Sequence, residues 1–80
     1  ASGRRLEVWT TEPCLQVYGA QNMDGTLPTK TAGRTLPQFA GVALETQHYP
    51  DSPNRPDFPT TVLRPSEKFH SRTEYRFSAE

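Results

Sequence analysis

Apolar and polar residues alternate along several short stretches of the chain, which is the pattern of half-buried β-strands. The alternation predicts strands over residues 5–11, 14–18, 39–47, 60–64 and 68–78. No stretch shows the period of about 3.6 residues that marks an amphipathic helix. The pattern therefore predicts an all-β chain of short antiparallel strands, of the kind found in a β-sandwich.

The alternation also predicts which side chains share a face, because successive side chains of a strand point to opposite sides of the sheet. In the first strand, Leu6 and Val8 are expected on one face, and Glu7 and Trp9 on the other. In the third, the two faces are predicted to hold Val42, Leu44 and Thr46, and Ala43, Glu45 and Gln47. The last strand is predicted to place apolar side chains on one face and charged ones toward water: Phe69, Ser71, Thr73, Tyr75 and Phe77 against Lys68, His70, Arg72, Glu74 and Arg76.

The segments between the strands carry turn and loop signals. Asp24-Gly25 is a common turn dipeptide, and residues 28–37 are polar and rich in Thr, with Gly33 among them, which favours an exposed excursion. Prolines recur at every third position from Pro50 to Pro59. That spacing predicts extended polyproline II geometry, because proline cannot donate to a sheet ladder.

Composition limits what the chain achieves alone. Apolar residues with Gly, and without Tyr, make up about 35% of the chain, below the roughly 45–50% of typical globular proteins. An 80-residue chain with eight prolines and no Ile is therefore not expected to fold stably by itself. The single Cys14 forms no internal disulfide, and no apolar run is long enough for a membrane span or signal peptide.

Charge argues against a nucleic-acid partner. Lys and Arg together number nine, as do Asp and Glu, so the formal net charge is zero. The cations are interspersed with acids, whereas a nucleic-acid module shows a basic excess or stripe. With one Cys and no Asn-X-Ser/Thr sequon, cytoplasm is the expected compartment.

Glu45 and Gln16 are the candidate chemical groups. A carboxylate flanked by Ala43 and Leu44 near a strand end is expected to be partly desolvated, and desolvation makes a carboxylate a better base. Gln16 carries both a donor and an acceptor, which suits a hydroxyl ligand. A solvated strand Glu and a Gln bonded to nearby backbone are the competing interpretations.

Other constellations are weaker. An oxygen-rich metal site would have to use Glu45, His48, Asp51 and Asp57, which have no recurring spacing and have proline between them. No metal and no cofactor is therefore predicted. Nothing in the sequence activates Cys14 as a nucleophile, and a small buried Cys is the better interpretation.

Several separated motifs occur together in a fixed order. They are Arg4–Pro13 (RRLEVWTTEP), Leu15–Tyr18 (LQVY), Asn22–Thr26 (NMDGT), Leu44–Asp51 (LETQHYPD) and Phe58–Pro65 (FPTTVLRP). In this order and approximate spacing, from about residue 3 to 77, the chain resembles the C-terminal end of the aldose 1-epimerase (galactose mutarotase) family. The resemblance implies that residues 1–80 are a C-terminal portion of one mutarotase-like antiparallel β-sandwich whose N-terminal part is missing.

The resemblance also implies an activity and site roles. The family interconverts the α and β anomers of free aldohexoses such as galactose and glucose by acid–base ring opening, with no cofactor or metal. The Glu of its Leu-Glu-Thr-Gln motif is the base, which corresponds to Glu45, and Gln16 matches a Gln that binds sugar hydroxyls. The family's general acid is an upstream His that this chain lacks, since neither His48 nor His70 matches it. The chain alone is therefore expected to be inactive and to need the remainder of its domain as partner.

Two departures from the family pattern lie near Gln16. Cys14 stands where a Gly is common, and Gly19-Ala20-Gln21-Asn22 replaces the usual Thr-Gly-Asn. These changes bear on sugar preference more than on the reaction. The sequence specifies neither the preferred aldose nor the oligomeric state.

Three alternatives remain open. A hexose-6-phosphate 1-epimerase would need a cationic phosphate clamp, and the LETQHYPD string favours an unphosphorylated sugar. A non-catalytic carbohydrate-binding sandwich would hold a sugar with Gln16, Trp9 and Glu45 without converting it. A PxxP ligand formed by the prolines of residues 53–59 would bind an aromatic groove, although a loop crossing the end of a sandwich explains the same prolines.

Overall fold

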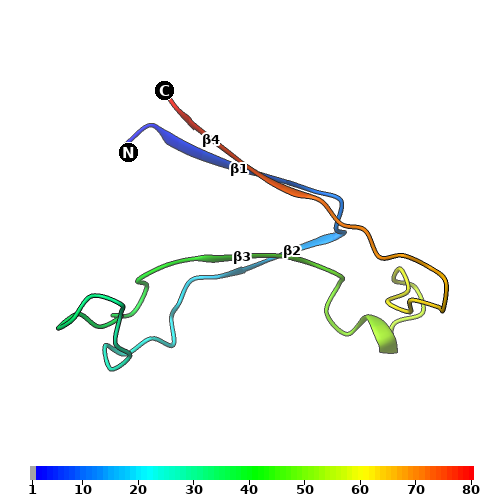
Figure 1. Cartoon of the computed structure of the whole chain (residues 1–80), viewed down its shortest axis with the longest axis horizontal. Helices are drawn as coiled ribbons and strands as arrows, with labels where there is room; N and C mark the ends of the chain where they lie inside the picture. Colours follow the sequence, from blue (N-terminus) through cyan, green and yellow to red (C-terminus); the bar gives the residue numbers. More distant parts are fainter. Residues whose placement is uncertain (1) are drawn as a thin grey trace. The chain divides into compact units, whose positions relative to one another are not determined.

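The computed structural model describes residues 2–80, and its regular secondary structure is almost wholly strand, with long irregular segments between the strands. In chain order the elements are β1 (Arg4–Thr10), β2 (Cys14–Tyr18), β3 (Ala43–Gln47), the short 3-10 helix η1 (Ser52–Asn54) and β4 (Thr73–Ala79) (Figure 1). The strands form two two-stranded sheets, β1–β4 and β2–β3. The prediction of an all-β chain is confirmed.

Two of the predicted strands are shorter than expected, for identifiable reasons. The third begins at Ala43 rather than at residue 39, because Phe39 has a positive φ of 61° and a turn closes between the Ala40 N–H and the Pro37 carbonyl. The last begins at Thr73 rather than at residue 68. Its partner β1 ends at Thr10, so residues 68–72 have no strand to continue the ladder.

The prediction of a strand over residues 60–64 is wrong. This stretch lies between two prolines, and the Val62 N–H donates to the Thr60 hydroxyl at 3.1 Å instead of to a partner strand. The polyproline II prediction for residues 50–59 also fails in part. Asp51 has a positive φ of 65° and leads into η1, and the Asn54 side-chain amide donates to the Asp51 carboxylate at 2.7 Å.

The chain divides into two compact units, one formed by Ala1–Leu15 with Thr46–Glu80 and the other by Gln16–Glu45. In the first unit β1 and β4 lie side by side and antiparallel (Figure 1), with Leu6 opposite Phe77 and Val8 opposite Tyr75. Because directly opposed residues point to the same side, these four side chains form one face, called here the apolar face. This register confirms which side chains share a face in both strands, but the prediction that Glu74 faces water is wrong, because Glu74 is half-buried.

On the other face of the β1–β4 ladder, charged side chains form ion pairs and a cation–π contact. The Arg76 guanidinium lies 4.1 Å from the centre of the Trp9 ring, and the Glu74 carboxylate pairs with Arg76 at 3.1 Å and with Arg72 at 2.5 Å. The hydrogen bond from Arg76, followed by the charge of Arg72, lowers the pKa of the Glu74 carboxyl from its ordinary value of 4.5. Arg5 and Glu80 form a further ion pair.

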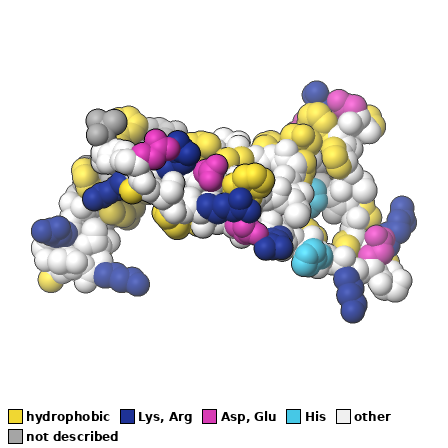
Figure 2. All heavy atoms as spheres, turned by 90° about the horizontal axis from the view of Figure 1, so that it is seen from above, with side chains coloured by type: hydrophobic (Ala, Val, Ile, Leu, Met, Phe, Trp, Pro, Cys, Tyr) yellow, Lys and Arg dark blue, Asp and Glu magenta, His cyan; other side chains and the backbone are white. Residues whose placement is uncertain are grey.

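The described residues bury very little. Ala20, 8% exposed, is the one buried apolar residue among residues 2–80, and no large side chain there is fully buried. On the apolar face, the exposed fraction is 41% for Leu6, 52% for Tyr75 and 76% for Phe77. Hydrophobic side chains are accordingly visible at the surface (Figure 2). Residues 2–80 therefore lack the core that a self-sufficient domain needs, as the composition predicts.

The second unit contains a long loop that follows β2. Its residues 27–36 fold back on themselves through a bridge between Pro28 and Thr35. The Leu36 N–H donates to the Leu27 carbonyl at 2.9 Å, and most of the segment is exposed. The predicted exposed excursion is therefore confirmed, and backbone hydrogen bonds close it on itself.

Among residues 2–80, the helical structure falls well short of the length and apolarity needed to cross a membrane.

Candidate functional site

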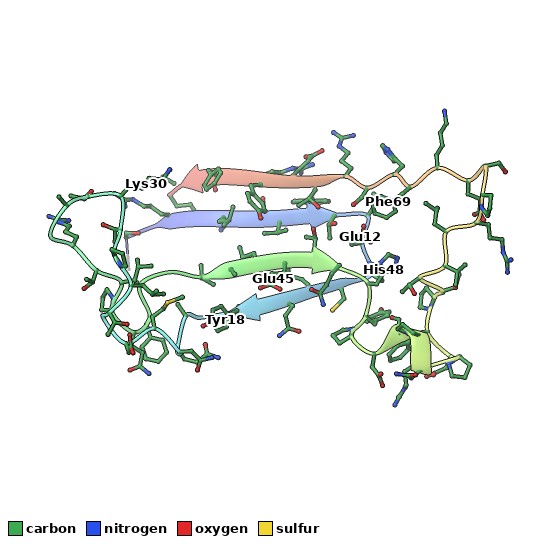
Figure 3. All side chains as sticks on the ribbon, turned by 60° about the horizontal axis from the view of Figure 1, so that its bottom comes forward. Glu12, Tyr18, Lys30, Glu45, His48 and Phe69 are labelled. Carbon is green, nitrogen blue, oxygen red and sulfur yellow. The ribbon has the colours of Figure 1, made fainter. Side chains whose placement is uncertain are left out.

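Gln16 and Glu45 occupy equivalent places in paired strands. Gln16 is the central residue of the five-residue strand β2, and Glu45 is the central residue of the five-residue strand β3. The two strands are neighbours in one sheet and run in opposite directions (Figure 3). Both residues belong to the second unit, so the ladder positions the two candidate groups on adjacent rigid backbones rather than on a loop.

The Glu45 carboxylate is open to solvent. Ala43, Leu44, Thr46 and Gln47 are half-buried, while Glu45 itself is exposed. The expectation that its apolar neighbours desolvate it is therefore wrong for this chain, because Leu44 points to the opposite face and the small Ala43 side chain on the same face does not cover it. Within residues 2–80 the carboxylate makes no hydrogen bond or ion pair, so its oxygens are free to accept a proton or a ligand hydroxyl.

The Gln16 side chain, like that of Glu45, is open to solvent. Its side chain is exposed, whereas Tyr18, two residues on, is half-buried. The competing interpretation, a Gln that satisfies neighbouring backbone, is not what the described residues show, since they offer its amide no hydrogen-bond partner. Its donor and its acceptor are both available.

The segment that departs from the family pattern, directly after β2, is held by several hydrogen bonds. Ala20 has a positive φ of 58°, unusual for a residue other than Gly. Its carbonyl accepts hydrogen bonds from the Met23 N–H at 3.2 Å and from the Phe39 N–H at 3.1 Å. The Gln38 side-chain amide donates to the Gln21 carbonyl at 2.9 Å. These bonds fix the chain that leaves the Gln16 strand to the chain that enters the Glu45 strand.

The two histidines stand in different environments. His48 is half-buried, with its ring centre 6.4 Å from that of Phe69 (Figure 3). His70 is exposed, as expected. The described residues contain no group of three or more His, Cys, Asp or Glu side chains able to hold a metal ion. Cys14 is a free, half-buried thiol.

Three threonine hydroxyls that the sequence alone did not single out are joined by hydrogen bonds. Thr73 Oγ1 lies 3.1 Å from Thr10 Oγ1 and 3.0 Å from Thr46 Oγ1, and the Glu12 N–H donates to Thr10 Oγ1 at 3.0 Å. The threonines are 63 and 27 residues apart in sequence, so no local pattern connects them. The one sequence feature that could have indicated the Thr10–Thr73 pair is the alternation of side chains along the two strands, which places both threonines on the same face.

Comparison with known proteins gives consistent matches over nearly the whole chain. The family model for aldose 1-epimerase matches residues 1–76. The chain is 49% identical over 78 residues to galactose mutarotase of Mus musculus and 47% identical over 78 residues to galactose mutarotase of Homo sapiens. It is 42% identical over 78 residues to aldose 1-epimerase of Escherichia coli (strain K12). These matches cover 98%, 98% and 95% of this chain, which spans only 22% of the length of each relative.

Proposed function

The chain belongs to the aldose 1-epimerase family, and on that premise we propose that it forms the part of a mutarotase that carries the general base. The observation that supports this most strongly is the placement of Glu45 and Gln16 at the centres of the paired strands β2 and β3. Both side chains are exposed and unpaired within residues 2–80. The substrate class is a free aldohexose such as galactose, because galactose is the sugar named for the mouse and human relatives.

The proposed reaction needs two proton transfers at the anomeric centre. Glu45 takes the proton of the C1 hydroxyl as the C1–ring-oxygen bond breaks, and an acid protonates the ring oxygen, which gives the open-chain aldehyde. Rotation about C1–C2 presents the other face of the carbonyl to the C5 hydroxyl. The ring recloses with the proton transfers reversed, and the product is the other anomer.

Gln16 serves binding rather than proton transfer. An amide side chain does not titrate, but it donates to one sugar hydroxyl oxygen while it accepts from another hydroxyl. Two such bonds orient the ring so that C1 lies at the Glu45 carboxylate, which is the positioning that makes a proton transfer fast.

The acid must come from outside these 80 residues. His48 is packed on Phe69 and His70 is an exposed residue beyond the sheet strands, so neither is assigned this role. The isolated chain is therefore proposed to be inactive and to act together with the remainder of its domain. Cytoplasm is the compartment that the single Cys and the lack of a sequon favour.

The test is a chimera in which this chain replaces the matched stretch of mouse galactose mutarotase, called here the chimera. Polarimetry of freshly dissolved α-galactose measures anomer interconversion. Glu45→Gln in the chimera is expected to lower kcat by about 100-fold or more, the usual contribution of a general base. Glu7→Gln, an equally conservative change of an exposed Glu on β1, serves as control and is expected to leave kcat unchanged. Near-normal interconversion in the Glu45→Gln variant contradicts the proposal.

A non-catalytic carbohydrate-binding module is the second candidate, favoured by one observation: Glu45 is exposed within residues 2–80 rather than shielded from water as a general base would be. It predicts that the chimera binds galactose, measured by calorimetry, but does not interconvert its anomers. An active chimera removes this candidate.

A further inference from the structure

Thr73 is the middle one of the three hydrogen-bonded threonines, and its two hydrogen bonds reach residues in two different strands. One reaches Thr10 at the end of β1, the strand that pairs with β4 (3.1 Å). The other reaches Thr46 in β3 (3.0 Å). Thr46 is the residue after Glu45, and it is half-buried while Glu45 is exposed, as expected for neighbours on opposite faces of a strand.

The geometry constrains what a substitution at Thr73 can do. A hydroxyl both donates and accepts one hydrogen bond along a chain, so Thr73 is the one residue whose removal breaks both links at once. Thr10 keeps a second bond, from the Glu12 N–H at 3.0 Å. Within residues 2–80, the Thr46 hydroxyl bonds Thr73 alone. Loss of the Thr73 hydroxyl therefore leaves the Thr46 side chain without its anchor.

We infer that Thr73 is a positioning residue for the proposed base, because its hydroxyl holds Thr46 and thereby fixes the strand backbone from which Glu45 projects. The inference rests on the proposed function for its catalytic consequence, but the structural link stands apart from it. No contact between Thr73 and substrate is required. Misplacement of a catalytic group by about 1 Å costs up to about 100-fold in rate, so a small shift of β3 is sufficient.

Three variants of the chimera separate this role from general strand stability. Thr73→Val keeps the branched shape and removes the hydroxyl, and is expected to lower kcat by about 10- to 100-fold with KM unchanged. Thr73→Ser keeps the hydroxyl and is expected to restore most of kcat. Thr61→Val makes the same chemical change at an exposed threonine outside the strands and is expected to leave kcat and KM unchanged.

A double-variant cycle then identifies the bond. If Thr73 acts through Thr46, Thr46→Val alone lowers kcat as Thr73→Val does, and the double variant is no worse than either single one. Additive losses, an equal rise in KM, or failure of Thr73→Ser to restore kcat each overturn the inference.

A second readout does not need turnover. Hydrogen–deuterium exchange at the backbone amides of Glu45 and Thr46 is expected to quicken in Thr73→Val and to stay slow in Thr73→Ser, because the anchor of β3 is lost only in the former. Unchanged exchange overturns the inference whatever the activity. If the parent chimera is inactive but its exchange responds as expected, the proposed function fails while the structural link holds.

Discussion

Replacement of Phe77 by alanine measures whether the apolar face of the β1–β4 ladder is covered when the chain is part of a complete domain. Phe77 lies opposite Leu6 in the ladder and is 76% exposed. A fully buried aromatic side chain hides roughly 200 Å². The contacts within the chain therefore hide about 50 Å², which corresponds to about 1 kcal/mol at 25 cal/mol per Å².

The free-energy cost of Phe77→Ala is larger if other residues of the domain cover the apolar face. If the remainder of the domain packs on Leu6, Val8, Tyr75 and Phe77, the substitution leaves a cavity as well as losing the transfer free energy, and buried Phe→Ala changes cost about 3–5 kcal/mol. We expect the larger value in the chimera. The assay is urea unfolding of the parent and the variant, with the midpoint compared at constant slope.

Glu7→Ala is the matched control, because Glu7 lies on β1 one position from Leu6 but on the opposite, polar face. It is expected to leave the midpoint almost unchanged. A cost near 1 kcal/mol for Phe77→Ala would refute the reasoning, since the apolar face would then be as open in the domain as it is in this chain.

Three further predictions follow from the same features. Gln16→Ala in the chimera is expected to raise KM for galactose about 5- to 150-fold, the loss of the two neutral hydrogen bonds proposed for its amide, and an unchanged KM in polarimetry contradicts the binding role. The 80-residue chain alone is expected to melt without a sharp transition in circular dichroism and to associate in sedimentation through its open apolar face; a cooperative monomer would contradict this. Because its arginine neighbours lower the pKa of Glu74 below 4.5, the stability that this carboxylate contributes is present above that pH and is lost as pH falls through the lowered pKa. Glu74→Gln should remove this part of the acid dependence of unfolding in the chimera, and identical acid profiles would refute it.

The parts of the fold that the sequence predicts well are those decided by neighbouring residues. Strand β2 was predicted with its observed bounds, because Pro13 ends the preceding strand and Gly19 follows directly. The two faces of β1 and β4 follow from alternation alone, and the register confirms them. Such features need no knowledge of distant partners.

The predictions that failed concern features that depend on which distant residues lie next to a segment in the fold. Residues 60–64 alternate like a strand, yet the described part of the chain offers them no partner strand, and the Val62 N–H bonds the Thr60 hydroxyl instead. The last strand begins at Thr73 because β1 ends at Thr10. The link from Thr73 to Thr46 joins residues 27 positions apart, and no spacing rule could have found it.

The exposure of Glu45 shows how the candidate site divides between this chain and its surroundings. The sequence identified the carboxylate through a motif, and the structure gives it a rigid position at the centre of a paired strand. The expected desolvation is absent, because residues 2–80 leave the side chain open. A general base gains from exclusion of water, which strengthens its electrostatic interactions with the substrate. If the proposed function is right, this chain supplies the position of the base, and the surface that packs on it must supply both the acid and the dry environment.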